Sequence, residues 1–151
     1  MRNELVANWM SPDVITVTPD TSLTDADNLL HEYNIRRLPV IDDENNLLGI
    51  LTLGDIREAS ASDATSLNIW ELNYLLEKLA VRKIMTPNPI TVYVNDSITT
   101  AASMMLENKI SGLPVLDPAD DSLVGIITES DIFSMVVQTW EEFESRELEP
   151  A

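Results

Sequence analysis

The chain has 151 residues, enough for one compact domain or for two small halves that share a sizeable core. Its formal net charge is -17, from 26 acidic and 9 basic residues, and such a field repels nucleic acid and anionic membranes. The absence of cysteine and the presence of 1 histidine exclude disulfides, thiolate chemistry and multi-histidine metal sites within one chain. A hydrophobic fraction of 44% with 5% aromatic residues is typical of an aliphatic α/β core.

The cellular location is inferred from what the sequence does not contain. No apolar run approaches the roughly 20 residues that cross a bilayer, and the first residues lack the apolar core of a signal peptide. We therefore expect a soluble, cytoplasmic protein. The acidic composition is explained either by solubility or by adaptation to a salty cytoplasm, and the sequence leaves both open.

The chain repeats itself. Its second half contains the same four segments as its first half, in the same order, with one inserted residue in the second turn. Such self-similarity indicates a tandem duplication. The matched pairs are WMSPDVITV (9–17) with IMTPNPITV (84–92), SLTDA (22–26) with SITTA (97–101), IRRLPVID (35–42) with ISGLPVLD (110–117), and GILTLGD (49–55) with GIITESD (125–131).

Each half predicts the element order β-α-β-β-α. Ser22 and Ser97 stand where helix N-caps should, before helices that run to about Tyr33 and Asn108. A second helix should begin near the threonine that follows the last strand of each half. The predicted strands are β-branched or apolar runs at 15–17, 38–41 and 47–51 in the first half, and 90–94, 113–116 and 123–127 in the second.

The sequence suggests four segments: a first repeat at 9–58, a linker with a connecting helix at 59–83, a second repeat at 84–138 and an acidic tail at 139–151. In the linker, the helical spacing of Ile69, Leu72, Leu76 and Leu79 predicts one apolar face. This face either packs on its own module or forms a dimer or partner surface. The tail, with Trp140 and Phe143 among acidic residues, is either a frayed helix or a docking segment.

The ordered double set of motifs resembles a tandem pair of cystathionine-β-synthase-type (CBS) domains, also called a Bateman module. The resemblance rests on Met-Ser/Thr-Pro openings, Leu-Pro-Val-Ile/Leu-Asp centres and Gly-x-x-Thr-x-x-Asp ends, each present twice. The linker further resembles stand-alone two-CBS proteins of the acetoin-utilisation type. The resemblance implies an α/β (α+β) fold of two β-α-β-β-α repeats packed with pseudo-twofold symmetry, often as a homodimer. It also implies clefts between the repeats that take AMP, ADP, ATP or S-adenosylmethionine as a regulatory ligand, with no obligatory cofactor.

The end of the second repeat carries chemistry that suits a nucleoside. Thr128 lies where a strand becomes a helix, so nearby N–H groups lack helical partners and favour a phosphate. The hydroxyls of Thr128 and Ser130 add donors, and Asp131 can accept two hydrogen bonds from a ribose diol. The alternative is purely structural, because Thr-x-x-Asp is also a helix capping box.

The first repeat has the same ending with different neighbours. It retains Thr52 and Asp55, but Gly54 replaces the serine hydroxyl. Arg36 and Arg37 precede its central strand, and an arginine there can pair with phosphate or serve in a surface salt bridge. Further basic candidates are Lys109 and the pair Arg82-Lys83, and the resemblance assigns Thr16 and Thr91 to the base or ribose.

We therefore expect a non-catalytic regulatory module that binds an adenosine-containing ligand and signals to an unidentified partner in trans. The alternative is a ligand-free dimerisation or scaffold module. A third possibility is metal-ion or ionic-strength sensing through the acidic turns at 42–46 and 117–121. An enzyme is not expected, because the sequence contains neither a P-loop nor a Ser/His/Asp arrangement.

Overall fold

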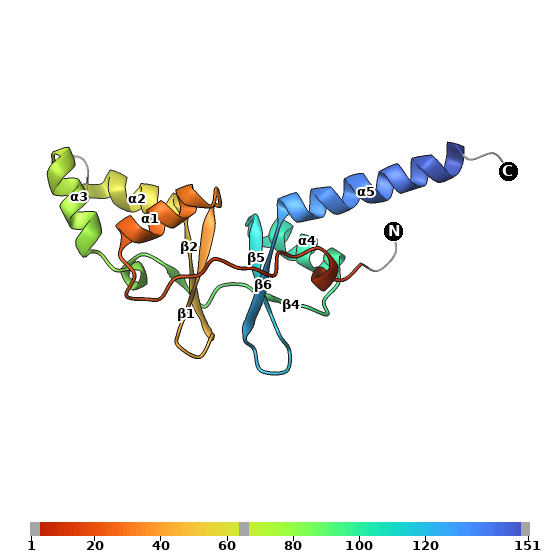
Figure 1. The fold of residues 1–151 in the computed structure, drawn as a ribbon, viewed down its shortest axis with the longest axis horizontal. Helices are drawn as coiled ribbons and strands as arrows, with labels where there is room; N and C mark the ends of the chain where they lie inside the picture. Colours follow the sequence, from red (N-terminus) through yellow and green to blue (C-terminus); the bar gives the residue numbers. More distant parts are fainter. Residues whose placement is uncertain (1–3, 64–66, 149–151) are drawn as a thin grey trace. The chain divides into compact units, whose positions relative to one another are not determined.

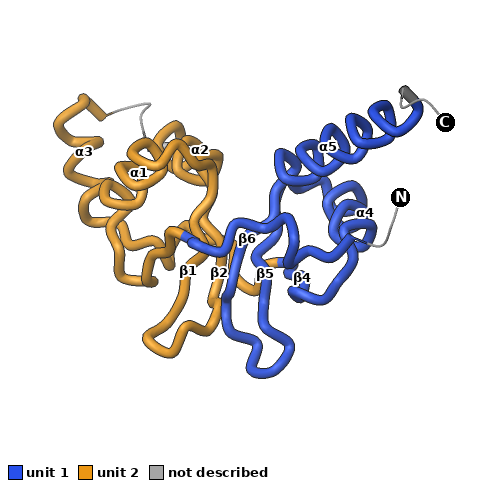
Figure 2. The backbone as a smooth tube through the Cα atoms, turned by 45° about the vertical axis from the view of Figure 1, so that its right-hand side comes forward, with its two compact units in different colours: residues 1–14, 90–151 blue, residues 15–89 orange. Residues whose placement is uncertain are grey.

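The computed structural model describes residues 4–63 and 67–148. The chain forms two compact units: unit 1 is Met1–Val14 with Ile90–Ala151, and unit 2 is Ile15–Pro89 (Figure 2). These units do not follow the sequence repeats. The opening residues of the first repeat belong to unit 1, and the opening residues of the second repeat, 84–89, belong to unit 2.

Unit 2 contains a three-stranded sheet of order β1-β2-β3. Figure 1 labels β1 and β2 of this sheet. Strand β2 is central and antiparallel to both neighbours, with Arg37 opposite Thr52 on one side and Ile50 opposite Thr86 on the other. The elements are α1 (Leu23–Glu32), β1 (Arg37–Ile41), β2 (Leu47–Thr52), α2 (Leu53–Asp63), α3 (Ile69–Lys78), the 3-10 helix η2 (Val81–Lys83) and β3 (Thr86–Pro87).

Unit 1 contains a second three-stranded sheet, of order β4-β5-β6. Strand β5 is parallel to β4 and antiparallel to β6, with Val92 opposite Val115 and Gly112 opposite Thr128. The elements are the 3-10 helix η1 (Val6–Asn8), β4 (Val92–Tyr93), α4 (Ile98–Asn108), β5 (Gly112–Leu116), β6 (Leu123–Thr128) and α5 (Glu129–Leu148).

The two predicted serine caps are confirmed. Ser22 Oγ accepts the N–H of Asp25 at 3.1 Å, and Ser97 Oγ accepts the N–H of Thr100 at 3.1 Å. Each bond satisfies one of the N–H groups that a helix leaves without an internal partner. This local chemistry fixes where α1 and α4 begin, as the sequence indicates.

The second and third predicted strands of each repeat are confirmed and form antiparallel pairs, whereas the opening strands are shorter than predicted. Residues 15–17 form no named strand, and Val17 makes a single parallel bridge to Val40. In the second repeat, only Val92–Tyr93 of the predicted 90–94 is strand. Strand β5 is buried at every position, which explains its continuous apolar sequence.

Each unit has its own hydrophobic core. The core of unit 2 joins α1, β1 and β2 through Leu23, Leu30, Leu38 and Leu51, and that of unit 1 includes Leu113 and Ile127. Among the described residues, no polar or charged side chain is buried. The polar and charged side chains of the described residues therefore lie outside these cores.

Gly49 and Gly125 are required by close approach of another segment of chain, since no glycine has a positive φ. A Cβ on Gly125 would lie 2.5 Å from Met10 Sδ, and one on Gly49 would lie 2.6 Å from Met85 Sδ. The Met-Ser-Pro and Met-Thr-Pro openings thus lie against the central glycines of β6 and β2. Backbone bonds hold the first of these contacts, because Ser11 and Ile126 exchange N–H···O=C bonds of 2.9 and 3.0 Å.

The connecting helix α3 packs on unit 2 by part of its predicted apolar face. Leu76 and Leu79 pack against the core, whereas Ile69 is 62% exposed. Trp70 and Tyr74, on a different side, are 80% and 64% exposed. The Leu76–Leu79 end therefore serves the module itself, and any self-association through α3 would use its exposed aromatic residues.

The acidic tail continues helix α5 without a break to Leu148. Helix α5 begins at Glu129 in the second repeat, so the repeat and the described part of the tail belong to one helix. Within residues 4–63 and 67–148, no helix combines the length and the apolar character needed to cross a bilayer.

Candidate functional site

The Thr-x-x-Asp ending of each repeat is a helix cap. In unit 2, the N–H of Thr52 donates to Asp55 Oδ2 at 2.9 Å, and the N–H of Asp55 donates to Thr52 Oγ1 at 3.1 Å. In unit 1, the N–H and the hydroxyl of Thr128 donate to Asp131 Oδ2 at 2.9 and 3.3 Å. The reciprocal capping box is complete in unit 2, whereas in unit 1 only its carboxylate half is present, because no bond joins the Asp131 N–H to Thr128 Oγ1. Any ligand contact is additional to this local role.

Capping leaves part of each carboxylate available. The side-chain hydrogen bonds that Asp131 and Asp55 accept all end at Oδ2, and neither Oδ1 bonds another of the described residues. Both side chains are half-buried rather than enclosed. Since each carboxylate oxygen has two lone pairs, a vicinal diol can donate to the free Oδ1 without opening the cap.

The helix N-termini offer fewer free N–H groups than the sequence predicts. The N–H of Leu53 donates to the carbonyl of Arg36 at 2.8 Å, and that of Glu129 donates to the carbonyl of Ser111 at 3.0 Å. The Gly54 and Ser130 N–H groups bond no other described residue. With a carboxylate beside them, these positions suit the hydroxyl groups of a sugar better than a phosphate.

The carbonyls of Arg36 and Ser111 are site groups that the motif analysis did not assign. A side-chain pattern carries no information about main-chain carbonyls, but the equivalence of the two repeats could have found them. Arg36 and Ser111 occupy matched positions, directly before β1 and β5 respectively. In both units, the carbonyl of this residue accepts the N–H of the first residue of the helix that follows the hairpin, α2 or α5.

The basic side chains of the first repeat lie beside its capped helix. Arg37 is opposite Thr52 in the β1–β2 register, and the main chain of Arg36 contacts Leu53 at the start of α2. Arg36 is exposed and Arg37 is half-buried. In unit 1, the matched positions are Ser111 and Gly112, so this concentration of positive charge is confined to unit 2.

The remaining basic candidates differ in their surroundings. Lys109 is exposed and ends α4 in a left-handed conformation with φ of 55°. Its N–H is bonded to the carbonyl of Met105. Arg82 forms a salt bridge with Asp20, so its charge is engaged on the surface of unit 2.

The structure divides the predicted site residues between the two units. Thr16 and Thr91 are half-buried, directly before Val17 and Val92. Unit 2 contains Thr16, Arg36, Arg37, Thr52 and Asp55, and unit 1 contains Thr91, Lys109, Thr128, Ser130 and Asp131. Each unit therefore contributes one complete set of threonine, carboxylate and basic groups.

The acidic turns do not form a metal centre within the described residues. Asp42 accepts bonds from the N–H of Glu44 and from both the N–H and the side-chain amide of Asn46. These bonds, that of the Asn46 N–H first, hold the pKa of Asp42 below its ordinary value. No group of three acidic or histidine side chains in residues 4–63 and 67–148 could hold a metal ion.

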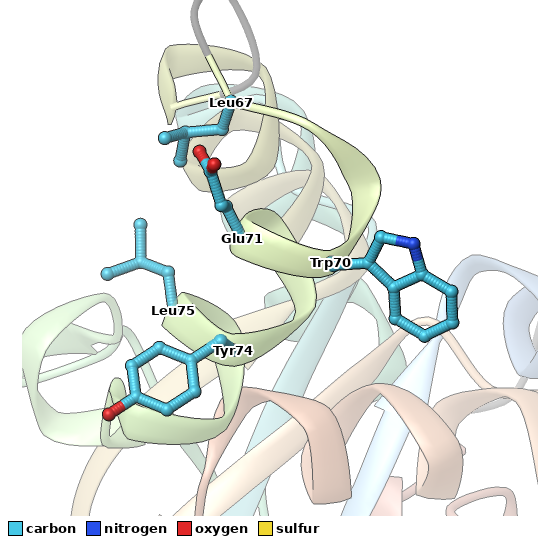
Figure 3. A pocket seen from close by; sticks show the side chains of 5 residues that line it. All are labelled: Leu67, Trp70, Glu71, Tyr74 and Leu75. Carbon is cyan, nitrogen blue, oxygen red and sulfur yellow. The ribbon is translucent and has the colours of Figure 1, made fainter.

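A surface pocket on α3 is separate from these residues. Leu67, Trp70, Glu71, Tyr74 and Leu75 line it, and their side chains project from the helix and the segment before it (Figure 3). The lining is apolar apart from Glu71, whose carboxylate accepts a bond from the Asn68 amide at 3.1 Å. None of the predicted site residues contributes to this pocket.

Comparison with known families identifies the repeats. The CBS domain model matches residues 6–62 and 81–138. The chain belongs to the CBS domain family. The two matches correspond to the duplicated motifs of the sequence, and each includes one Thr-x-x-Asp cap.

Solved CBS pairs share this fold over nearly the whole chain. CBSX2 in complex with AMP is 32% identical, with a TM-score of 0.76, and the match covers 90% of this chain and 98% of that one. The CBS domain pair of MJ0100, in complex with 5′-methylthioadenosine and S-adenosyl-L-methionine, is 32% identical with a TM-score of 0.74, over 87% and 98%. A putative acetoin utilization protein (AcuB) from Vibrio cholerae is 28% identical with a TM-score of 0.77, over 97% and 98%.

The curated relatives differ in length. A CBS domain-containing protein of Dictyostelium discoideum is 36% identical over 140 residues, which is 91% of this chain and 94% of that protein. A homoserine O-acetyltransferase of Methanosalsum zhilinae is 33% identical over 136 residues, covering 90% of this chain but 25% of the enzyme. In such an enzyme, the CBS pair accounts for only a fraction of the chain.

Proposed function

We propose that this CBS pair is a non-catalytic, cytoplasmic regulatory module that binds an adenosine-containing ligand and signals to a partner protein in trans. In each unit, the carboxylate that caps a helix also binds the ribose hydroxyls of the ligand. AMP, ADP, ATP, S-adenosylmethionine and 5′-methylthioadenosine all present this diol. The bound ligand acts by favouring one arrangement of the module over others.

The observation that supports the proposal is the hydrogen bonding of the Asp55 and Asp131 carboxylates. Each carboxylate is held in place by its cap while Oδ1 makes no bond within the described residues. A positioned acceptor with an open oxygen is what recognition of a diol needs. The AMP complex of CBSX2 and the adenosyl complexes of MJ0100 support the choice of ligand class.

Isothermal titration calorimetry of ligand-free protein against AMP, ADP, ATP, S-adenosylmethionine and 5′-methylthioadenosine tests the proposal. We expect saturable heat with at least one of these ligands. Adenine, which lacks the ribose, is the matched control and should bind far more weakly. Binding of adenine as tight as that of the nucleosides would contradict the role given to the carboxylates.

The exposed aromatic residues of α3 favour a second candidate, a homodimerisation or scaffold module. Trp70 and Tyr74 are 80% and 64% exposed, next to Ile69 at 62%, which is an unusual amount of apolar surface on one short helix. Sedimentation equilibrium of the wild type and of the Trp70→Ser/Tyr74→Ser variant tests it. A dimer that the variant loses supports a scaffold role, whereas a monomeric wild type excludes self-association through this helix.

A further inference from the structure

Helix α5 carries an apolar stripe that the core of unit 1 does not cover. Met135 is 4% exposed and Ile132 packs against the core, so one side of the helix is anchored in its own unit. The exposed apolar side chains recur at intervals of three and four, so they share another side of the helix. They form the α5 stripe: Phe133 (64% exposed), Val136 (42%), Val137 (54%), Trp140 (60%) and Phe143 (50%).

The matched helices of unit 2 have no such stripe. The repeats align GILTLGD with GIITESD and SLTDA with SITTA, so α2 corresponds to α5 and α1 corresponds to α4. Along these helices, unit 2 has polar or small residues where unit 1 exposes apolar ones. The matched pairs, with the residue of unit 1 first, are Phe133 and Arg57, Val136 and Ser60, Val137 and Ala61, and Leu106 and His31.

Unit 2 also covers part of its helical layer with its own chain. Helix α3 packs against α1 and α2, and its Leu76 reaches the core together with Leu79. Unit 1 contains no third α-helix within residues 4–14 and 90–148. Figure 1 shows the C-terminal half of α5 clear of the other elements of unit 1. The α5 stripe therefore has no cover from its own unit.

We infer that the α5 stripe packs on the α5 stripe of a second copy, so that unit 1 of one copy faces unit 1 of the other. A twofold axis pairs one surface patch with itself, and an apolar face is complementary to its own copy. In the reverse orientation, unit 1 against unit 2, the Arg57 guanidinium would be buried against Phe133 and Val137. Burial of a charge against apolar side chains is costly, so the difference between the repeats selects the orientation.

The response to salt separates the two orientations. With a net charge of -17, each copy repels the other, and this repulsion is screened beyond about 8 Å at physiological ionic strength. An interface of two apolar stripes should therefore tighten as salt is added. An interface between unit 1 and unit 2 would depend on Arg57 pairing with the glutamates of α5, and it should weaken as salt is added.

Cross-linking reports the orientation directly, because the chain contains no cysteine. Val137→Cys places a thiol on the stripe, and Ala61→Cys places one at the matched, exposed position of α2. A short bismaleimide is added to Val137→Cys alone and to an equilibrated mixture of Val137→Cys with mass-tagged Ala61→Cys. We expect Val137→Cys to cross-link to itself and the mixture to give no product that joins positions 137 and 61. A predominant product between 137 and 61 would overturn the inference.

Sedimentation equilibrium measures how strongly the stripe contributes. Phe133→Arg gives unit 1 the residue that unit 2 has at the matched position, and we expect the dimer Kd to rise at least about tenfold. Arg57→Ser is the matched control and should change the Kd less than about twofold. Because Phe133 is 64% exposed, the circular dichroism spectrum of Phe133→Arg should be that of the wild type.

Three further results would overturn the inference: a wild type that stays monomeric, a dimer that weakens with added salt, or a dimer that Phe133→Arg leaves intact. The α3 variant Trp70→Ser/Tyr74→Ser should dimerise as the wild type does, since it leaves the stripe unchanged. A dimer lost in that variant and kept in Phe133→Arg would assign the association to α3. The inference does not depend on the proposed ligand, because all of these measurements use ligand-free protein.

Discussion

Gly49 lies in close contact with Met85. A Cβ on Gly49 would stand 2.6 Å from Met85 Sδ and 2.8 Å from the carbonyl oxygen of Thr86. The sulfur is at the end of a flexible side chain, but the carbonyl belongs to a strand that is paired with β2. The Met-Thr-Pro opening of the second repeat thus packs against strand β2 of the first repeat, at Gly49, where no side chain fits.

Gly49→Ala should therefore destabilise the protein by about 1–3 kcal/mol, the usual cost of overpacking. Gly125→Ala should cost less, since its nearest backbone atom, the carbonyl oxygen of Ser11, is 3.1 Å away. Gly54→Ala is the matched control, because its Cβ would meet only Thr52 Oγ1 at 3.5 Å. Alanine within α2 should be neutral or stabilising by about 0.5–1 kcal/mol. Urea unfolding measures all three, and equal effects at Gly49 and Gly54 would contradict this account.

The contact between these segments is the part of the fold that the sequence did not predict. Ser22 and Ser97 identify their helices because capping is local, and the hairpins are evident from apolar runs that end in acidic turns. Strand β3, however, has two residues, Thr86–Pro87, and no periodicity that could reveal it. Its partner lies in the other repeat, so the pairing depends on tertiary contacts alone.

As for the fold, the sequence predicted the local features of the candidate site but not those that depend on tertiary contacts. The spacing of Thr128 and Asp131 indicates a capped helix and an acidic acceptor, and the structure contains the Asp131 half of that cap. The main-chain bonds from Leu53 to Arg36 and from Glu129 to Ser111 could not be read from side-chain patterns. These bonds reduce the number of free N–H groups, and the positions that remain beside the carboxylate suit a hydroxyl group better than a phosphate.

Arg36→Ala should distinguish ligands by the group at the 5′ position. Because arginine stabilises a phosphate and contributes nothing to a neutral thioether, we expect about three- to tenfold weaker binding of AMP and unchanged binding of 5′-methylthioadenosine. Arg57→Ala, which removes an equal charge from the exposed surface of α2, is the control. If both substitutions weakened AMP binding equally, Arg36 would act only through its long-range charge and not through a direct contact with the phosphate.

Asp42 should make the stability of the first repeat sensitive to acid. Its pKa is lowered in the folded protein, chiefly by the N–H of Asn46 and then by the Asn46 side chain. A lowered pKa stabilises the fold above the ordinary value of 3.8, and that contribution is lost as the pH falls through the folded pKa. Removing the amide in Asn46→Ala should raise the pKa of Asp42, measured by NMR titration of its carboxyl carbon. An unchanged pKa would show that the side-chain bond is not formed in solution.

The central claim is that the capping carboxylates also bind the ribose. Asparagine at 55 and 131 retains one oxygen for the cap and replaces the free oxygen by an amide, so it separates the two roles. Asp131→Ala, in contrast, should lose about 1 kcal/mol of stability along with the ligand contact. Asp96→Asn is the matched control, because Asp96 accepts the N–H of Tyr93 at 2.8 Å in a similar turn outside the site.

The most direct measurement is calorimetric titration of 5′-methylthioadenosine and AMP into the wild type, Asp55→Asn/Asp131→Asn and Asp96→Asn, with the melting temperature of each ligand-free protein recorded. We predict that the double variant melts near the wild-type temperature and gives no saturable heat, while Asp96→Asn binds as the wild type does. A double variant that binds both ligands with wild-type affinity would contradict the account.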